Sequence, residues 1–179
     1  MARQLVLVIN GYPRTGKDTA ACMLSARLEA KGWACHEISS VDPVRHALAD
    51  LGVPVHRKTP AERNLMAEIQ SALLRYDWWP IREIVRYVET RMEHAEKSAF
   101  LVHMREPAAI RTFRDLLAER GLRLRTILVD RKSAERVATN DADASVETMT
   151  YDLTLDNNGT LEDLDRECAR LAERLETSR

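Results

Sequence analysis

The stretch Gly11–Thr19, which reads GYPRTGKDT, decides the fold of this chain. It matches the pattern G-x-x-x-x-G-K, follows the apolar run Leu5–Asn10 directly, and precedes a segment with helical spacing. Gly11 and Gly16 permit backbone angles that side chains would block, so the amide groups of the loop can point inward. Because the N-terminus of the next helix adds positive potential, such a ring of amides suits phosphate groups. The stretch therefore predicts a phosphate-binding loop.

The side chains of this loop indicate how a nucleoside triphosphate would be held. Lys17 is expected to reach the β- and γ-phosphates and to neutralise charge in the transition state of phosphoryl transfer. Arg14 is a second candidate cation for catalysis. Asp18 stands where Ser or Thr commonly offers a hydroxyl to Mg²⁺, and either holds Mg²⁺ through water or caps the helix. The residues expected to bind ATP here are Gly11, Arg14, Thr15, Gly16, Lys17, Asp18 and Thr19.

Strands and helices alternate along the chain. Apolar runs predict strands at Leu5–Asn10, Ala34–Ser39, Ala99–Met104, Leu122–Asp130 and Tyr151–Asp156. Helical patterns predict helices at Lys17–Lys31, Pro43–Leu51, Pro60–Tyr76, Ile81–Lys97, Pro107–Arg120 and Thr160–Glu176. This order predicts an α/β fold of three layers, in which helices cover both faces of a five-stranded parallel sheet and ligands bind at the carboxyl ends of the strands. We expect one domain over residues 1–179, with a helical acceptor-side cap at 53–98 and a short lid at 131–148.

Composition excludes several classes of protein. Of the 179 residues, 45% are hydrophobic and 31% charged, an ordinary balance for a soluble globular domain. The formal net charge of −1 supplies no global attraction to nucleic acid or to an anionic membrane. Three cysteines far apart in the sequence argue against a metal or disulfide framework and favour a reducing cytoplasm. The run Leu5–Ile9 is too short for a signal peptide or a membrane span.

The apolar pair Trp78–Trp79 has three possible roles: it packs a helix junction, stacks on a base, or forms a surface for a second copy of the chain.

The motif GKDT and the closing segment YDLTLDNNGTLEDL (Tyr151–Leu164) resemble the nucleoside monophosphate kinase group of P-loop kinases. The closest resemblance is to phage-type deoxynucleoside monophosphate kinases, whose loop also reads GKDT. Animal-type phosphomevalonate kinases share GKD, and dephospho-CoA kinases share the closing segment. These motifs therefore do not identify the substrate. The resemblance implies that Asn157 and Gly159 line the base of ATP, although a turn with a helix cap explains the same residues.

The segment VDPVR after the second predicted strand resembles the acceptor segment of that group. The resemblance implies that Asp42 and Arg45 face the acceptor and that Arg45 grips its phosphate, since a guanidinium matches phosphate oxygens bidentately. Asp42 binds a sugar hydroxyl, acts as a base for a hydroxyl acceptor, or caps the helix that begins at Pro43. The segment AERNLMAEIQ (Ala61–Gln70) resembles the helix that carries an acceptor-phosphate arginine, which makes Arg63 the candidate.

The segment HMREP after the third predicted strand lacks the acid that many P-loop enzymes place there to assist Mg²⁺. His103 and Met104 occupy the expected places. Arg105 is a candidate for catalysis and acceptor binding near the phosphates, and Glu106 is the nearest substitute acid. The alternative is that Glu106 simply begins the next helix.

The segment DRKSAER after the fourth predicted strand places Arg131 and Arg136 where the resembling kinases keep lid arginines. Such arginines close over the phosphates of ATP and exclude water, which suppresses hydrolysis. Asn140 and Asp143 are candidate hinge residues of this lid. A solvated charged loop is the other interpretation.

Three functions follow, in order of preference. The first is a Mg²⁺-dependent kinase that transfers the γ-phosphoryl group of ATP to a nucleoside or deoxynucleoside monophosphate. The second keeps the kinase chemistry but takes a hydroxyl acceptor, either dephospho-CoA-like or a hydroxymethylated pyrimidine in a nucleotide or in DNA. A DNA acceptor would need a basic groove, for which the candidates are Arg75, Arg82, Arg86 and Arg91. The third is a nucleotide-binding regulator with weak hydrolysis, because the acid after the third strand is missing.

Overall fold

The computed structural model describes residues 3–53, 55–57, 59–133, 146 and 149–177. The elements are β1 (Arg3–Asn10), α1 (Lys17–Glu29), β2 (Ala34–Ser39), α2 (Asp42–Asp50), α3 (Pro60–Asp77), α4 (Trp79–Met92), β3 (Lys97–His103), α5 (Pro107–Ala118), β4 (Leu124–Asp130), β5 (Leu153–Asp156) and α7 (Leu161–Thr177). None of the helices in this part of the chain combines the length and the apolar character that a membrane crossing requires.

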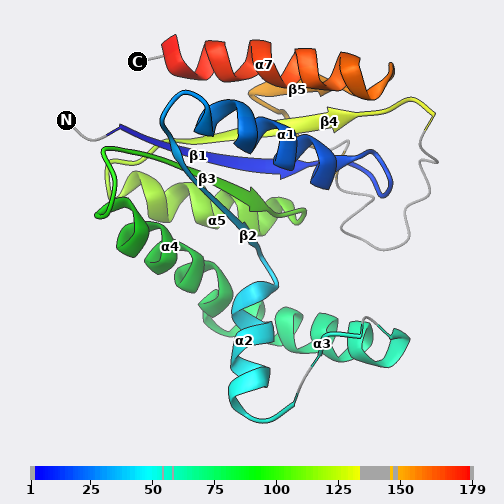
Figure 1. Ribbon diagram of the computed structural model, residues 1–179. Helices are drawn as coiled ribbons and strands as arrows, with labels where there is room; N and C mark the ends of the chain where they lie inside the picture. Colours follow the sequence, from blue (N-terminus) through cyan, green and yellow to red (C-terminus); the bar gives the residue numbers. More distant parts are fainter. Residues whose placement is uncertain (1–2, 54, 58, 134–145, 147–148, 178–179) are drawn as a thin grey trace.

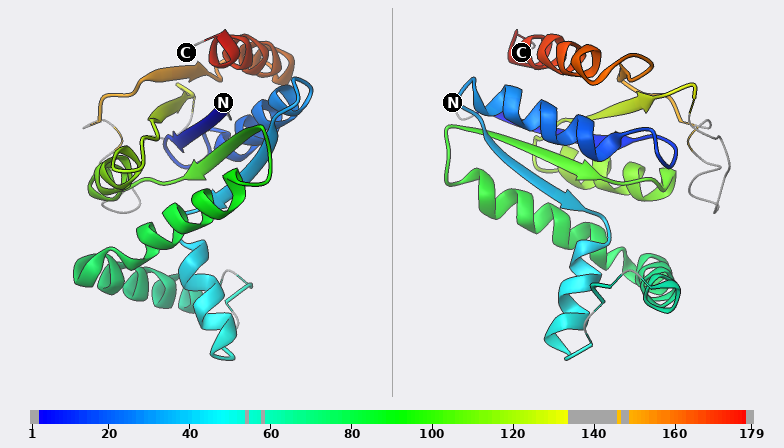
Figure 2. Two further views of the ribbon diagram at one scale, coloured as in Figure 1. Left: turned by 90° about the vertical axis from the view of Figure 1, so that its left-hand side faces the viewer. Right: turned by 45° about the vertical axis from the view of Figure 1, so that its right-hand side comes forward.

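The strands form one parallel sheet in the order β2-β3-β1-β4-β5. Helices α1 and α7 cover one face of the sheet, and α4 and α5 cover the other (Figures 1 and 2). This arrangement confirms the predicted three-layer α/β fold with five parallel strands. All the strands therefore end at the same edge, which places the segments that follow them side by side.

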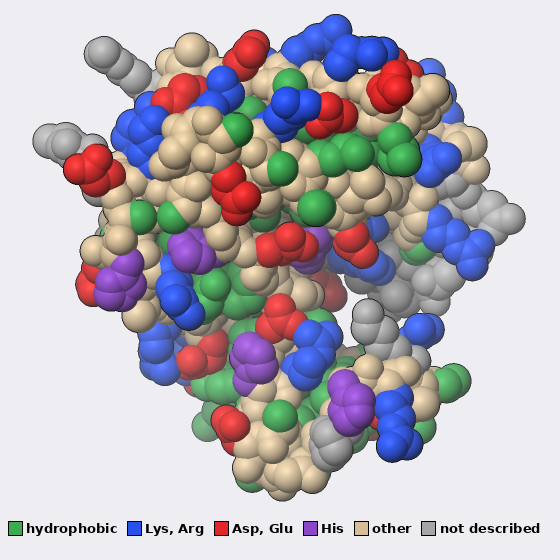
Figure 3. Space-filling model, viewed as in Figure 1, with side chains coloured by type: hydrophobic (Ala, Val, Ile, Leu, Met, Phe, Trp, Pro, Cys, Tyr) green, Lys and Arg blue, Asp and Glu red, His purple; other side chains and the backbone are tan. Residues whose placement is uncertain are grey.

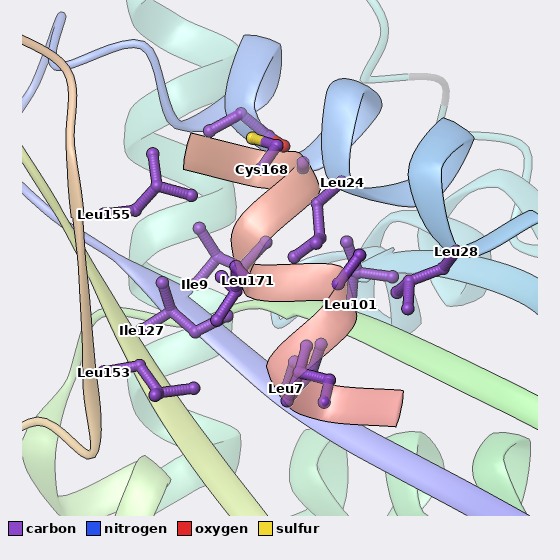
Figure 4. Packing of buried hydrophobic residues seen from close by; sticks show 14 of the residues in the cluster. Leu7, Ile9, Leu24, Leu28, Leu101, Ile127, Leu153, Leu155, Cys168 and Leu171 are labelled. Carbon is purple, nitrogen blue, oxygen red and sulfur yellow. The ribbon is translucent and has the colours of Figure 1, made fainter. Parts of the chain in front are cut away.

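Strand β1 joins the two cores because its side chains alternate between the faces of the sheet. Leu7 and Ile9 point toward α1 and α7 (Figure 4), whereas Val6 and Val8 belong to the core under α4 and α5. These four side chains are at most 2% exposed. Each contributes roughly 1.5–3 kcal/mol by leaving water. The loop after β1 thus follows directly on the buried half of this strand.

Helices α2 and α3 project from the sheet edge (Figure 1) and have a small core of their own. Val44, Leu48 and Val55 form its buried centre, and Trp79 packs against it. Trp78 separates α3 from α4 with a left-handed backbone (φ 59°) and packs on the core under α4. The two tryptophans therefore pack a helix junction.

The predicted segment between α4 and β3 differs clearly from the structure. Helix α4 ends at Met92 instead of Lys97, and β3 begins at Lys97 instead of Ala99. Lys97 pairs with Arg3 in the sheet register, and its ammonium group lies 2.9 Å from the carboxylate of Glu176. The apolar run alone misses this start, because the first two residues of the strand are polar.

Candidate active site

The loop between β1 and α1 has the backbone that the glycine pattern predicts. Gly11 and Gly16 have φ values of 147° and 85°. A Cβ atom at Gly11 would lie 2.6 Å from the carbonyl oxygen of Val129, and one at Gly16 would lie 2.5 Å from Nδ2 of Asn157. Both glycines are therefore required by close approach as well as by their backbone angles. Arg14, with φ 62°, is exposed at the outer side of this loop.

Lys17 begins α1 and is nearly buried, at 9% exposure. Its ammonium group bends back over the loop and donates hydrogen bonds to the carbonyl oxygens of Gly11 (2.7 Å) and Tyr12 (2.6 Å). The cation is thus held at the mouth of the loop, at the positive end of a helix. Thr15 is buried, and its hydroxyl also donates to the oxygen of Tyr12 (2.9 Å). Thr19 is exposed on the first turn of α1.

Asn157 holds the phosphate loop from the far end of the chain. The side chain is 7% exposed, and Nδ2 donates to the carbonyl oxygen of Thr15 over 2.7 Å. Its backbone amide donates to the oxygen of Asp130, at the end of β4. Asn157 thereby ties the loop to β4 and β5. The following Gly159 permits the approach of Asp163, whose carboxylate accepts from the backbone and hydroxyl of Thr160 at the start of α7.

Asn10, the last residue of β1, is a second buried polar anchor. Its Oδ1 accepts the amide hydrogen of Gly11 (2.7 Å), and Nδ2 donates to the hydroxyl of Tyr151 (3.0 Å). Burial, with a smaller effect of Tyr12, raises the pKa of Tyr151 to about 12, so the phenol stays protonated at neutral pH. It can therefore donate to the carbonyl oxygen of Val146. The start of the loop is fixed by neutral hydrogen bonds.

A cavity of about 480 Å³ opens beside Lys17, between α1, β2, α2 and the β3–α5 connection. It brings together Lys17, Asp18, Arg45, Arg105 and Glu106, all expected at the site. Its other lining residues are Ile9, Glu37, Ser39, Ser40, Val41, His103 and Met104. The cavity lies at the carboxyl ends of the parallel strands, the place where ligands commonly bind in such sheets.

Asp42 lines a different cavity, outside β2. One carboxylate oxygen accepts the amide hydrogen of Ser39 (2.7 Å), and the other pairs with Arg45. The aspartate therefore closes the turn between β2 and α2 and orients Arg45, whose side chain reaches the cavity beside Lys17.

Arg63 is exposed on α3 and lines neither of these cavities. Gln70, two turns later on the same face of α3, instead contacts Ser40, a residue that lines the cavity beside Lys17. It is 5% exposed and donates from Nε2 to the carbonyl oxygen of Ser40 over 3.0 Å. The spacing of seven residues from Arg63 could have drawn attention to it.

Two groups at the β3–α5 connection have distinct environments. Oε2 of Glu106 is buried and has no hydrogen-bond partner among the described residues. Nε2 of His103 lies 2.7 Å from the carboxylate of Glu37, and Nδ1 lies 3.9 Å from the carboxylate of Asp18. The sequence identified the place of His103 but not its pairing with Glu37, because β2 and β3 become neighbours only in the sheet.

The lid lies mostly outside the described residues, including Arg136, Asn140 and Asp143. Arg131 is described and exposed, and its Nε donates to the hydroxyl of Ser133 over 3.2 Å. The next residue, Lys132, donates its amide hydrogen to Oδ1 of Asn158. The start of the predicted lid is therefore joined to the Asn157–Gly159 turn.

The residues beside Lys17 fit a nucleotide-bound divalent cation. Mg²⁺ takes oxygen ligands and usually keeps several waters beside one or two carboxylates and the phosphates of a substrate. The Asp18 side chain, 97% exposed and adjacent to Lys17, is such a carboxylate. Within the described residues, no three histidine, cysteine or acidic side chains could hold a metal together. Phosphate oxygens would therefore supply much of the coordination.

Comparison with known proteins shows the fold. No protein-family model matches the sequence, and no curated protein matches it. The Mycobacterium tuberculosis APS kinase CysC in complex with AMPPNP and APS is similar, with a TM-score of 0.58, 16% identity, and coverage of 99% of this chain and 100% of that chain. A tunicamycin resistance protein of Deinococcus radiodurans has a TM-score of 0.55 at 16% identity, covering 97% and 94% of the two chains. The three-layer α/β fold with five parallel strands is therefore shared with these solved structures.

Proposed function

We propose that this protein is an ATP-dependent kinase whose acceptor is a small molecule, a nucleoside or deoxynucleoside monophosphate. The observation that carries the proposal is the single cavity shared by Lys17, Arg45 and Arg105. A cation at the phosphate loop and two guanidinium groups suit a reaction that joins two phosphate-bearing ligands. The similar APS kinase holds AMPPNP, an ATP analogue, which supports ATP as the donor.

The contacts of Asp42 favour a phosphate acceptor over a hydroxyl acceptor. A hydroxyl acceptor would use Asp42 as a base, yet both oxygens of its carboxylate already accept hydrogen bonds, from Ser39 and Arg45. A phosphate acceptor needs no base, because its oxygens are already ionised near neutral pH. The role of Asp42 is then to aim Arg45 at the acceptor phosphate.

Glu106 supports an acceptor that also carries hydrogen-bond donors. A carboxyl oxygen without a partner is costly when buried, and a ligand N–H or O–H would satisfy it. Oε2 of Glu106 is such an atom within the described residues, and Glu106 lines the cavity. The sugar hydroxyl or base amino group of a nucleotide meets this requirement.

The chain's own groups contribute by position and charge. Lys17 and the loop amides would hold the donor phosphates, and Arg45 and Arg105 would hold the acceptor phosphate in line with them. A divalent cation held near Asp18 would supply further neutralisation of charge on the phosphates. The lid arginines Arg131 and Arg136 would exclude water from the transfer.

The nucleic-acid alternative receives less support from the described residues. On the face that Figure 3 shows, basic and acidic side chains are interspersed. Each arginine of the expected groove has a partner on α3 or α4: Ser71 for Arg75, Asp77 for Arg82, Glu83 for Arg86 and the ring of Tyr87 for Arg91. A small acceptor is therefore preferred to DNA.

The test is an assay of ADP release with ATP and Mg²⁺ across the common nucleoside and deoxynucleoside monophosphates. We expect stimulation by one or a few of them. Arg45→Met should raise the KM for that acceptor about tenfold or more, since one charge-assisted contact is lost. Arg82→Met is the matched control on α4 and should leave this KM unchanged.

The same assay decides between the remaining functions. Turnover stimulated only by hydroxyl acceptors, such as dephospho-CoA, would overturn the monophosphate assignment while keeping the kinase. Basal hydrolysis that no acceptor changes would instead favour a nucleotide-binding regulator.

A further inference from the structure

We propose that His103 and Asp18 together bind the divalent cation of the nucleotide, and that the site therefore prefers Mn²⁺ or Co²⁺ to Mg²⁺. The inference rests on the proposed function, because the phosphates of ATP supply the remaining ligands. It adds to the kinase assignment a nitrogen ligand, a residue that orients it and a metal preference.

The two side chains meet at the position where the cation is expected. Asp18 directly follows Lys17 at the start of α1, and His103 ends β3, the neighbour of β1 in the sheet. Nδ1 of His103 and Oδ1 of Asp18 are 3.9 Å apart, and both residues line the cavity beside Lys17. At metal–ligand distances of about 2.1 Å, two ligands lie about 3.0 Å apart when adjacent and about 4.2 Å apart when opposite. The observed separation falls between these values, and the exposed Asp18 side chain is free to turn.

Glu37 prepares the histidine for this role. Its carboxylate lies 2.7 Å from Nε2 of His103, and a carboxylate can only accept, so Nε2 carries the proton. In the neutral ring, Nδ1 then keeps its lone pair on the side of Asp18. A metal-binding histidine commonly donates its second N–H to a carboxylate, which sets the tautomer and fixes the orientation of the ring. The pair Glu37–His103 has this arrangement, with the imidazole only 19% exposed.

In many P-loop enzymes, the phosphate loop supplies a hydroxyl ligand to the cation, and the end of the strand supplies an acidic residue. The two sources are exchanged in this chain. Here the loop offers the carboxylate of Asp18 and the strand offers the imidazole of His103. Imidazole nitrogen suits transition metals, whereas Mg²⁺ favours oxygen ligands and water. The acid missing after β3 is therefore replaced by a different ligand chemistry at the same place.

The experiment measures the metal–nitrogen bond directly. Protein labelled with ¹⁵N-histidine is mixed with Mn²⁺ and unlabelled AMPPNP, and the electron–nuclear double resonance spectrum of Mn²⁺ is recorded. A ¹⁵N coupling of the size of a direct bond is expected, and it can come only from the protein. It should vanish in His103→Gln and persist in His94→Gln, a control at an exposed histidine of the other cavity.

A second variant tests the orientation by Glu37. Glu37→Gln should weaken Mn²⁺ binding in the ternary complex about 10- to 100-fold, the usual effect of removing such a partner of a ligand. Replacement of Mn²⁺ by Mg²⁺ should weaken the dependence of AMPPNP affinity on His103. Equal losses with both metals would contradict the proposed preference.

The possible results separate this inference from the proposed function. If AMPPNP and Mn²⁺ bind but no directly bonded ¹⁵N appears, His103 is not a ligand and only this inference is wrong. If AMPPNP fails to bind with Mn²⁺, with Mg²⁺ and without metal, the phosphate-loop assignment itself is overturned. The wild-type spectrum is decisive even if a variant fails to fold.

Discussion

The described contacts of the loop between β1 and α1 are largely buried hydrogen bonds between neutral groups, whereas the cavity beside it is bordered by charged pairs that are partly exposed. Asn10 and Asn157 are 0% and 7% exposed and bind the loop backbone. By contrast, the side chains of Arg45 and Asp42 are 40% and 21% exposed. A buried, satisfied network is costly to disturb. An ion pair that is open to water on one side contributes less, about 0–1 kcal/mol at the surface, so a ligand can replace it. Under the proposed function, the loop is a preformed donor site and the cavity beside it is an adjustable acceptor site.

The largest expected effect is at the cation of the donor site. Lys17→Ala should lower kcat on the order of a hundredfold or more, because it removes the central charge contact with the transferring phosphoryl group. The fold should survive, which circular dichroism and thermal melting would show. Lys31→Ala, at an exposed lysine beyond the end of α1, is the control. Catalysis near the parental rate would refute the phosphate-loop assignment.

Asn157→Ala tests whether the donor site is held by its buried anchor. The substitution removes the hydrogen bond to the carbonyl oxygen of Thr15, and an unsatisfied buried acceptor costs about 1–3 kcal/mol. We expect the free energy of unfolding in urea to fall by that amount and the KM for ATP to rise. Asn64→Ala, at an exposed position of α3, is the control and should change stability by no more than about 0.5 kcal/mol. Equal effects at the two positions would remove the contrast between the sites.

Asp42→Asn tests the adjustable side of the comparison. If Asp42 orients Arg45, the KM for the acceptor should rise about tenfold, equivalent to about 1.4 kcal/mol, while kcat changes little. Steady-state kinetics with the acceptor varied at saturating ATP measure both constants. A fall of kcat by a hundredfold or more at unchanged KM would instead identify Asp42 as a base and a hydroxyl as the acceptor.

The smallest effect is expected at a charged cluster at the opposite edge of the sheet. The pKa of Glu176 is lowered from 4.5 to about 2, chiefly by hydrogen bonds from Lys97 and Trp33. Because the folded-state pKa lies below the unfolded value, the contribution to stability is complete above about pH 4.5 and is lost as the pH falls through about 2. Chemical unfolding of the parent and of Glu176→Gln should therefore differ near neutral pH and converge in acid. The kinetic constants at neutral pH should not change, and a change would show that this cluster is coupled to the site.

The conformation of the loop between β1 and α1 and the alternation of strands and helices could be predicted from the sequence, because both depend on spacing over short distances. The glycine positions, the apolar run of β1 and the helix after it are local patterns, and the structure reproduces them. The polar ends of β3 and α4 were placed wrongly, since Lys97 becomes part of a strand only by pairing with β1.

Other features depend on which strands become neighbours. The hydrogen bond from Asn157 to Thr15 joins residues 142 positions apart, and that between His103 and Glu37 joins residues 66 apart. No spacing rule connects such pairs, because the order of strands in the sheet differs from their order in the chain. The sequence by itself thus determined which residue types lie at the site. The hydrogen-bond partners that orient these residues were decided only by the packing of the sheet.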